Sequence, residues 1–238
     1  MDSDRESERL FSLRLSQVME DIGVNRRMIE WRRNTFLRIE TFSTICSILK
    51  YIPLTDYVFG SQTEATTTFW MESDHDTLHS DESVHVILHL NKWQKGKPNL
   101  LVLRDELTPP QHCYLQRLRG DVPLPAVKTE GPDDVLIGDG RVLVANTWVE
   151  WHKAYSSGWF KITQHGPSIT VNEEADNVYA YQCAELPEEC QFMFHRPRPG
   201  HWPSTGIMER AREAGVFFVP QSYRESPPPK SCEHEAFI

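Results

Sequence analysis

The chain has 238 residues, of which 39% are hydrophobic, and its formal net charge at pH 7 is −9. This length and composition predict a globular protein with a real core, built as one large domain or two small ones. The acidic balance argues against a dedicated nucleic-acid binder, because such binding depends mainly on neutralising phosphates.

The sequence shows neither the long apolar segment that marks a membrane protein nor the signal region and cysteine pattern that mark a secreted one. The charged start MDSDRESERL has no apolar signal region, and no stretch approaches the run of about 20 apolar residues that spans a bilayer. Five cysteines without a CxxC pair favour reduced thiols over a disulfide framework. We therefore expect a soluble cytoplasmic protein, with the nucleus as the second choice and no membrane partner.

The first part of the chain is predicted to be helical. After a disordered start at residues 1–7, residues 8–50 form one long helix or two nearly collinear ones, because no proline precedes Pro53 and Gly23 offers a place for a kink. Arg26 and Arg33 lie on one side of this helix. We interpret them first as solvated flanks of the helix and second as a contact surface for RNA or DNA.

The middle of the chain is predicted to consist of strands. Alternating or short apolar runs predict strands at 84–90, 100–105, 113–119 and 177–183, and the GDG at 138–140 predicts a hairpin. The segment 149–176 is mixed, with a short helix at its start and a loop around HGPS at 165–168.

The last part is predicted to hold two helices and a strand. A helix, a proline-rich turn with Trp202 packed on the core, and a second helix ending near Ala214 precede the strand VFFVP. Residues 221–238 lack periodicity and are expected to be extended or disordered. The fold class is α+β: a mixed twisted sheet with packed helices, in a single core at 8–220.

The stretch GSQTEATTTFWMESDHDTL, residues 60–78, carries the chemistry. If 74–78 is a strand, Asp74 and Asp76 point to one face and offer two hard oxygen ligands at one spot. Gly60 frees the backbone at a turn, and Ser61 opens the next segment with N–H groups that suit a phosphate. The alternative is a Ser/Thr/Asp-rich surface loop whose aspartates cap turns.

Four histidines near this stretch invite a zinc site. No cysteine pair joins them, and the expectation is satisfied or exposed imidazoles rather than metal ligands. The four are His75, His79, His85 and His89.

The Gly-Ser turn followed by acid-x-acid resembles the nucleotidyltransferase superfamily of DNA polymerase beta. More specifically, the chain looks like the Mab-twenty-one (male-abnormal) family and the cyclic GMP-AMP synthase-like receptors in their invertebrate form. The resemblance runs from the first helix to about Pro220. It rests on VFGSQTEATTTFWMESDHDTL, KPNLLVLRDELTPPQHCYLQ, HGPSIT, DNVYAYQCAELP and FHRPRPGHWP.

This resemblance implies a polymerase-beta-like core that holds two Mg²⁺ or Mn²⁺ ions between three carboxylates and a nucleoside triphosphate. Carried over by motif position, Asp74 and Asp76 bind the metals, while Gly60 and Ser61 cradle the phosphates. The third carboxylate of the family sits on a later strand, and Asp176 is the matching position.

Other acids compete for the third place. A third ligand has to come from a strand beside the first pair, which favours Asp176 over the loop glutamates Glu173 and Glu174 and over Asp105 and Glu106. Asp176 could also be a turn residue at the start of a strand.

The resemblance further implies an enzyme that joins nucleoside triphosphates, ATP and GTP, into a cyclic or linear oligonucleotide second messenger of innate immune signalling. Double-stranded RNA or DNA on the arginine-bearing helix is the expected activator. The sequence ends at Ile238 without the second, all-helical lobe of that family, so we expect a truncated chain. The alternative is a catalytically inactive interaction or developmental protein that keeps only the fold.

Overall fold

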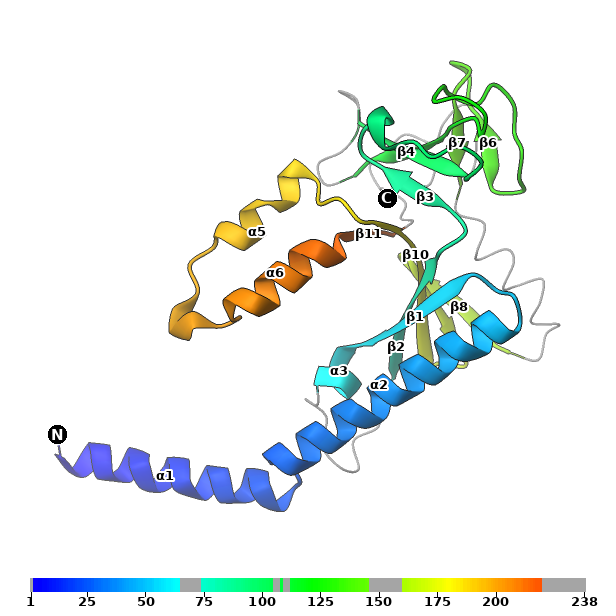
Figure 1. Ribbon diagram of the computed structural model, residues 1–238. Helices are drawn as coiled ribbons and strands as arrows, with labels where there is room; N and C mark the ends of the chain where they lie inside the picture. Colours follow the sequence, from blue (N-terminus) through cyan, green and yellow to red (C-terminus); the bar gives the residue numbers. More distant parts are fainter. Residues whose placement is uncertain (1, 65–73, 105–107, 109–111, 146–159, 220–238) are drawn as a thin grey trace.

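The computed structural model describes residues 2–64, 74–104, 108, 112–145 and 160–219. These residues form an α+β fold with five α-helices and two mixed β-sheets (Figure 1). The helices are α1 (Asp2–Asp21), α2 (Arg26–Leu49), α3 (Gly60–Glu64), α5 (Phe192–His195) and α6 (Thr205–Ala214), with three short 3-10 turns at Leu90–Lys92, Glu188–Cys190 and Pro199–His201.

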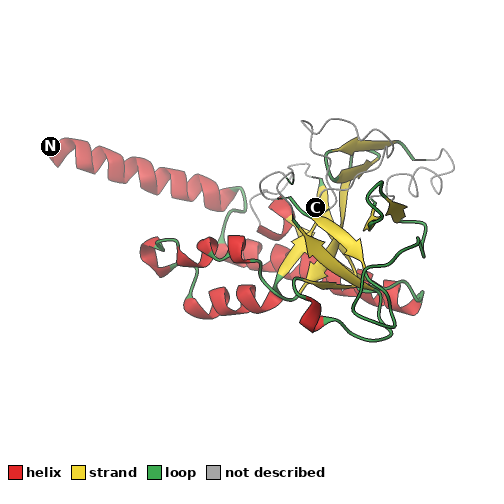
Figure 2. Cartoon of the chain, turned by 90° about the horizontal axis from the view of Figure 1, so that it is seen from above, coloured by secondary structure: helices red, strands yellow, loops and turns green. Residues whose placement is uncertain are grey.

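The N-terminal region is two helices that meet at Gly23. Gly23 has φ +86, a left-handed conformation that glycine adopts without strain, and the side chain of Asn25 then caps α2 by accepting from the Met28 N–H. The break at Gly23 is thus confirmed. Figure 1 shows a clear change of direction there, so the helices are not nearly collinear, and α1 projects away from the sheets in Figure 2.

The disorder expected for residues 1–7 is wrong for residues 2–7, because α1 begins at Asp2. Polar and charged residues with adequate helix propensity can extend a helix that apolar periodicity alone does not mark.

The first sheet carries the residues of interest. Its strands are ordered β1-β2-β10-β9-β8, and β11 pairs with the far end of β10. β2 is antiparallel to β1 and parallel to β10. The bounds are β1 (Leu54–Phe59), β2 (His75–Asp81), β8 (Ile162–His165), β9 (Ser168–Val171), β10 (Ala175–Cys183) and β11 (Val216–Phe218).

Helix α2 covers one face of this sheet (Figure 1). Glu40 of α2 accepts a hydrogen bond from the Val58 N–H at 2.8 Å, and Thr44 accepts one from the Asp56 N–H at 3.0 Å. These bonds satisfy main-chain groups of β1, which is the edge strand of this sheet among the residues that the structure describes.

The second sheet has the order β3-β4-β5-β7-β6, with β3 parallel to β4 and the remaining pairs antiparallel. Its core residues Val86, Leu100 and Leu115 pack with Tyr181 at the end of β10 and Phe218 of β11. A single sheet was expected, and this second sheet is the correction. Its strands are β3 (His85–Ile87), β4 (Asn99–Leu103), β5 (Tyr114–Arg117), β6 (Asp134–Leu136) and β7 (Val142–Val144).

The hairpin predicted around Gly138–Gly140 is confirmed, since β6 pairs antiparallel with β7. A second hairpin, β8–β9, was missed, although a turn does lie at Gly166 within the expected loop. Its strands contain Thr, Gln, His and Ser, so the sequence lacks the apolar alternation that marks a strand. Pairing with β10 stabilises this hairpin, which the sequence pattern does not mark.

The C-terminal helices follow the prediction in part. Gly215 with φ +74 ends α6, and β11 follows it, as expected. Trp202 is 75% exposed, so its predicted packing on the core is wrong. The predicted tail at 221–238 lies outside the described residues. So does the start of the segment 149–176, where a short helix was expected, because the structure describes this segment only from residue 160 onward.

Within the described part of the chain, no helix is long and apolar enough to cross a membrane. No disulfide joins the four described cysteines, Cys46, Cys113, Cys183 and Cys190, to one another. Cys232 lies outside the described residues.

Candidate metal centre

The two aspartates of the DHD motif share one face of the first sheet, as predicted. Asp74 immediately precedes β2, and Asp76 is its second residue, so the period of two points both side chains the same way. His75 points to the opposite face, where its ring lies 5.5 Å from the ring of Phe36 on α2. The acids therefore stand on the face of the sheet that α2 does not cover.

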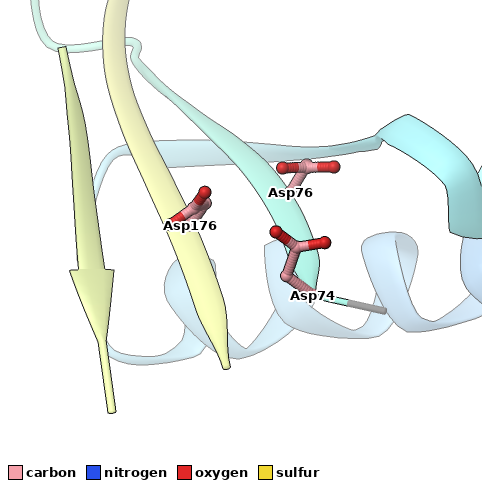
Figure 3. Close-up of side chains that lie close together, drawn as sticks. All are labelled: Asp74, Asp76 and Asp176. Atoms are coloured by element: carbon pink, nitrogen blue, oxygen red, sulfur yellow. The ribbon is translucent and has the colours of Figure 1, made fainter. Parts of the chain in front are cut away.

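The third carboxylate comes from the neighbouring strand β10. Asp176 is paired in register with Asp76 across the parallel β2–β10 ladder. One carboxylate oxygen from each of Asp74, Asp76 and Asp176 lies within 4.8 Å of the others (Figure 3). Asp74 is exposed, whereas Asp76 and Asp176 are half-buried. The position that motif matching favoured is thus the acid that reaches the pair.

The competing acids do not join this cluster where the structure describes them. Glu173 lies in the turn before β10 and forms an ion pair with Lys161, and Glu174 is exposed in the same turn. Asp105 and Glu106 lie outside the described residues.

Gly60 and Ser61 open α3 directly after β1. The main chain at Gly60 passes so close to Asp76 that a Cβ atom there would lie 1.9 Å from Oδ2 of Asp76. Gly60 also has φ +71, which side chains with a Cβ rarely adopt. A residue with a Cβ would force Asp76 to move, so the turn at Gly60 and the DHD motif meet closely in space.

Helix α2 fixes the position of α3. Arg32 donates to the side chain of Gln62 at 2.9 Å, and Gln62 is buried. Arg33 donates from Nε to the carbonyl of Thr63 at 3.2 Å. These bonds tie the turn that follows Gly60 to the same helix that supports the sheet.

The negative charges of the clustered carboxylates repel one another. Burial raises the pKa of Asp76 above its ordinary value of 3.8, and the nearby negative charges of Asp74 and Asp176 raise it further, whereas His75 lowers it in part. Glu64 at the end of α3 adds a smaller effect in the same direction. A divalent cation would offset this repulsion, because hard carboxylate oxygens at short separations suit such an ion.

A buried polar network lies on the opposite face of the same strands, and the sequence did not predict it. The ring of His79 places Nδ1 2.6 Å from Oδ1 of Asp56 and Nε2 3.0 Å from Oδ1 of Asn177. Ser43 of α2 donates to the other oxygen of Asp56, and the ring of Tyr179 stacks on His79 at 4.8 Å. The network joins α2, β1, β2 and β10 behind the acid cluster.

Two of the four histidines that suggested zinc have hydrogen-bond partners elsewhere in the fold. His79 belongs to the network above, and His85 Nε2 lies 3.2 Å from the carbonyl of Lys92. Among the residues that the structure describes, the only group of three with metal-ligand geometry is the aspartate cluster. That His75, His79, His85 and His89 are not zinc ligands stays a prediction.

The two candidate nucleic-acid contacts are both engaged on α2. The side chain of Arg26 is 91% exposed and forms an ion pair with Glu30, while Arg33 is bonded to Thr63. Both residues are exposed.

Comparison with known proteins adds no assignment. No protein-family model matches the sequence, and no curated protein matches it. The described geometry shows that the three aspartates could hold a metal ion.

Proposed function

We propose that this chain is a metal-dependent nucleotidyltransferase of the Mab-twenty-one and cyclic GMP-AMP synthase-like type. The observation that carries the proposal is the convergence of Asp74, Asp76 and Asp176 within 4.8 Å, facing a glycine that lies against Asp76. A turn glycine, an acid pair on one strand and a third acid on the next strand are the parts that such chemistry requires.

In this proposal the three aspartates hold two Mg²⁺ or Mn²⁺ ions. The ions supply positive charge that polarises phosphate oxygens and favours an attacking alkoxide. Gly60 and Ser61 lie beside the triphosphate in this proposal, which the close approach of the main chain at Gly60 to Asp76 supports. The role of the chain is thus to position the nucleotides and to concentrate negative ligands at one point.

The proposed reaction joins two nucleoside triphosphates, ATP and GTP. A ribose hydroxyl oxygen of one nucleotide bonds to the α-phosphorus of the other, the bond from that phosphorus to pyrophosphate breaks, and the hydroxyl proton passes to solvent. Pyrophosphate leaves with the bonding electron pair. One such transfer gives a linear dinucleotide, and a second transfer within it, with loss of the second pyrophosphate, closes the ring; either product would serve as a second messenger in innate immune signalling.

Double-stranded RNA or DNA is the proposed activator, through α2. Both guanidinium groups belong to exposed residues, and each has a partner on the protein, Glu30 for Arg26 and the carbonyl of Thr63 for Arg33. If Arg26 contacts a phosphate, Arg26→Ala should lower the salt dependence of duplex binding by roughly one phosphate contact.

The direct test incubates the full chain with Mn²⁺ or Mg²⁺, labelled ATP and GTP, and duplex RNA or DNA. We expect an oligonucleotide product from the wild type and none from Asp74→Ala/Asp76→Ala. Absence of product above that double variant, together with absence of metal-dependent nucleotide binding, would overturn the proposal and favour a non-catalytic interaction protein.

A further inference from the structure

One row of side chains crosses the first sheet at the acid cluster. Asp76 of β2 is paired with Asp176 of β10, and Asp176 is paired with Thr170 of β9. Residues paired in register project from the same face of a sheet, so these three side chains stand side by side. The row continues to Thr163 of β8, which is paired with Thr170.

Thr170 makes a specific contact within this row. Its hydroxyl Oγ1 donates a hydrogen bond to Oδ1 of Asp176 at 2.5 Å. A threonine hydroxyl has a single proton to donate, and an ionised aspartate only accepts. The bond therefore orients the carboxylate of Asp176 and leaves lone pairs of Oδ2 and Oδ1 for another ligand.

The fold does not need this hydroxyl. The β9–β10 pairing is made by the main chain, and the strand β9 is anchored in the core by Ile169, which is 1% exposed. On the other face of β10, the side chain of Asn177 is held by His79 Nε2 at 3.0 Å. Removing one hydroxyl from the half-buried Thr170 leaves both anchors in place.

We infer that Thr170 is a positioning residue for the metal centre, because it fixes the carboxylate of Asp176 in the direction of Asp74 and Asp76. This inference rests on the proposed metal-binding function of the three aspartates. Outer groups that orient a metal ligand typically change metal affinity by about 10–100-fold when they are removed. Thr170 does not touch the ion or the nucleotide in this account; it acts through Asp176.

The test measures Mn²⁺ binding to the full chain by electron paramagnetic resonance of the free ion, without nucleotide. Thr170→Val keeps the shape of the side chain and removes the hydroxyl, so we expect Mn²⁺ affinity to fall by about tenfold or more. Thr170→Ser restores a hydroxyl and should recover most of the affinity. Urea unfolding of the metal-free protein should change little in either variant.

Thr163→Val is the matched control, since it removes a half-buried threonine hydroxyl from the neighbouring strand of the same row. It should bind Mn²⁺ like the wild type. If Thr170→Val proves unstable, the Mn²⁺ affinities of Thr170→Ala and Thr170→Ser are compared instead, at equal fractions of folded protein. This comparison also tests whether the hydroxyl contributes to Mn²⁺ binding.

The outcomes separate this inference from the proposed function. If Asp176→Asn abolishes Mn²⁺ binding while Thr170→Val binds as tightly as the wild type, the metal centre stands and the role of Thr170 is overturned. If Thr170→Val and Thr170→Ser lose affinity equally, orientation by the hydroxyl is also overturned. If the wild type does not bind Mn²⁺, both proposals fall.

Discussion

Gly60 and Asp76 lie in such close contact that a single added carbon at residue 60 would come within 1.9 Å of Oδ2 of Asp76. The contact joins the turn after β1 to the acid on β2, and these strands are neighbours in the sheet, with Phe59 paired to Asp76. The position of the Asp76 carboxylate therefore depends on the absence of a side chain at residue 60.

Gly60→Ala should weaken both the fold and the metal centre. The left-handed backbone at φ +71 and the clash with Asp76 should together cost about 1–3 kcal/mol of unfolding free energy. The displaced carboxylate should also lower Mn²⁺ affinity. Urea unfolding and Mn²⁺ titration of the same preparations measure the two effects.

Gly96→Ala is the control for this substitution. Gly96 has a similar φ of +77, but a Cβ there meets nothing within 4 Å. Gly96→Ala should lose unfolding free energy because of its left-handed backbone, and it should keep wild-type Mn²⁺ affinity. Equal loss of Mn²⁺ binding in both variants would show that the contact between Gly60 and Asp76 has no special role.

The raised pKa of Asp76 predicts a pH dependence of the metal-free protein. Because burial and the neighbours Asp74 and Asp176 raise this pKa above 3.8, the folded state holds the Asp76 proton more tightly than the unfolded state. Stability should fall as pH rises from 3.8 through the raised pKa, and the penalty should persist above it. Asp76→Asn should remove this penalty and be more stable than the wild type at neutral pH in EDTA.

The measurement is the difference in unfolding free energy between wild type and Asp76→Asn across mildly acidic to neutral pH. We expect the advantage of the variant to shrink as pH falls. Added Mn²⁺ should reverse the order at neutral pH, because only the wild type then gains binding energy. A difference independent of pH would contradict the assignment.

The pair Asp56–His79 should contribute the opposite pH dependence. Burial alone would raise the pKa of Asp56, but the hydrogen bonds from His79 and Ser43 outweigh it and hold the pKa below 3.8. Its stabilisation is present above the unfolded value and is lost as pH falls through the lowered folded pKa. Asp56→Asn should cost about 3 kcal/mol at neutral pH, since it breaks a buried pair.

The exposed pair Arg119–Asp121 provides a comparison, because its partners are joined by short contacts but face solvent. Asp121→Asn should cost much less than Asp56→Asn in urea unfolding at the same pH, since exposed ion pairs contribute little. Equal costs would show that burial of the Asp56–His79 network does not stabilise the fold.

The buried thiols should resist alkylation. Burial raises the pKa of Cys113 to about 12 and also raises the pKa of Cys183, so both are protonated at mildly alkaline pH. Cys46 and Cys190 are partly exposed. Iodoacetamide should label the exposed pair more than about tenfold faster, as mass spectrometry of peptides would show, and urea should remove the difference. Equal labelling in the folded protein would contradict the packing of Cys113.

Several features of the fold could be predicted from local pattern. The alternation at Asp74 and Asp76 predicted their common face, the apolar run at 177–183 predicted β10, and Gly23 predicted the break between α1 and α2. Each of these depends on a few neighbouring residues, so the sequence contains the needed information.

Local sequence patterns could not predict contacts between residues that are far apart in the sequence. His79 and Asn177 are 98 positions apart, and only the parallel alignment of β2 with β10 brings them together. The lone acid Asp56 within a strand was the available signal for a buried partner, since a carboxylate is rarely buried unpaired. Thr170 gave no signal at all, because β8 and β9 lack apolar alternation.

The most direct test of the central claim is a Mn²⁺ titration of the full chain, comparing wild type with Asp76→Asn and with Asp81→Asn. Asp81 is on the same strand but outside the cluster, where it accepts from the Ser83 N–H at 2.8 Å. We predict that wild type and Asp81→Asn bind Mn²⁺ alike and that Asp76→Asn binds more than about tenfold more weakly, since losing a ligand costs at least as much as losing a group that orients one. Equal binding by all three proteins, or binding by none, would contradict the claim that these aspartates form a metal centre.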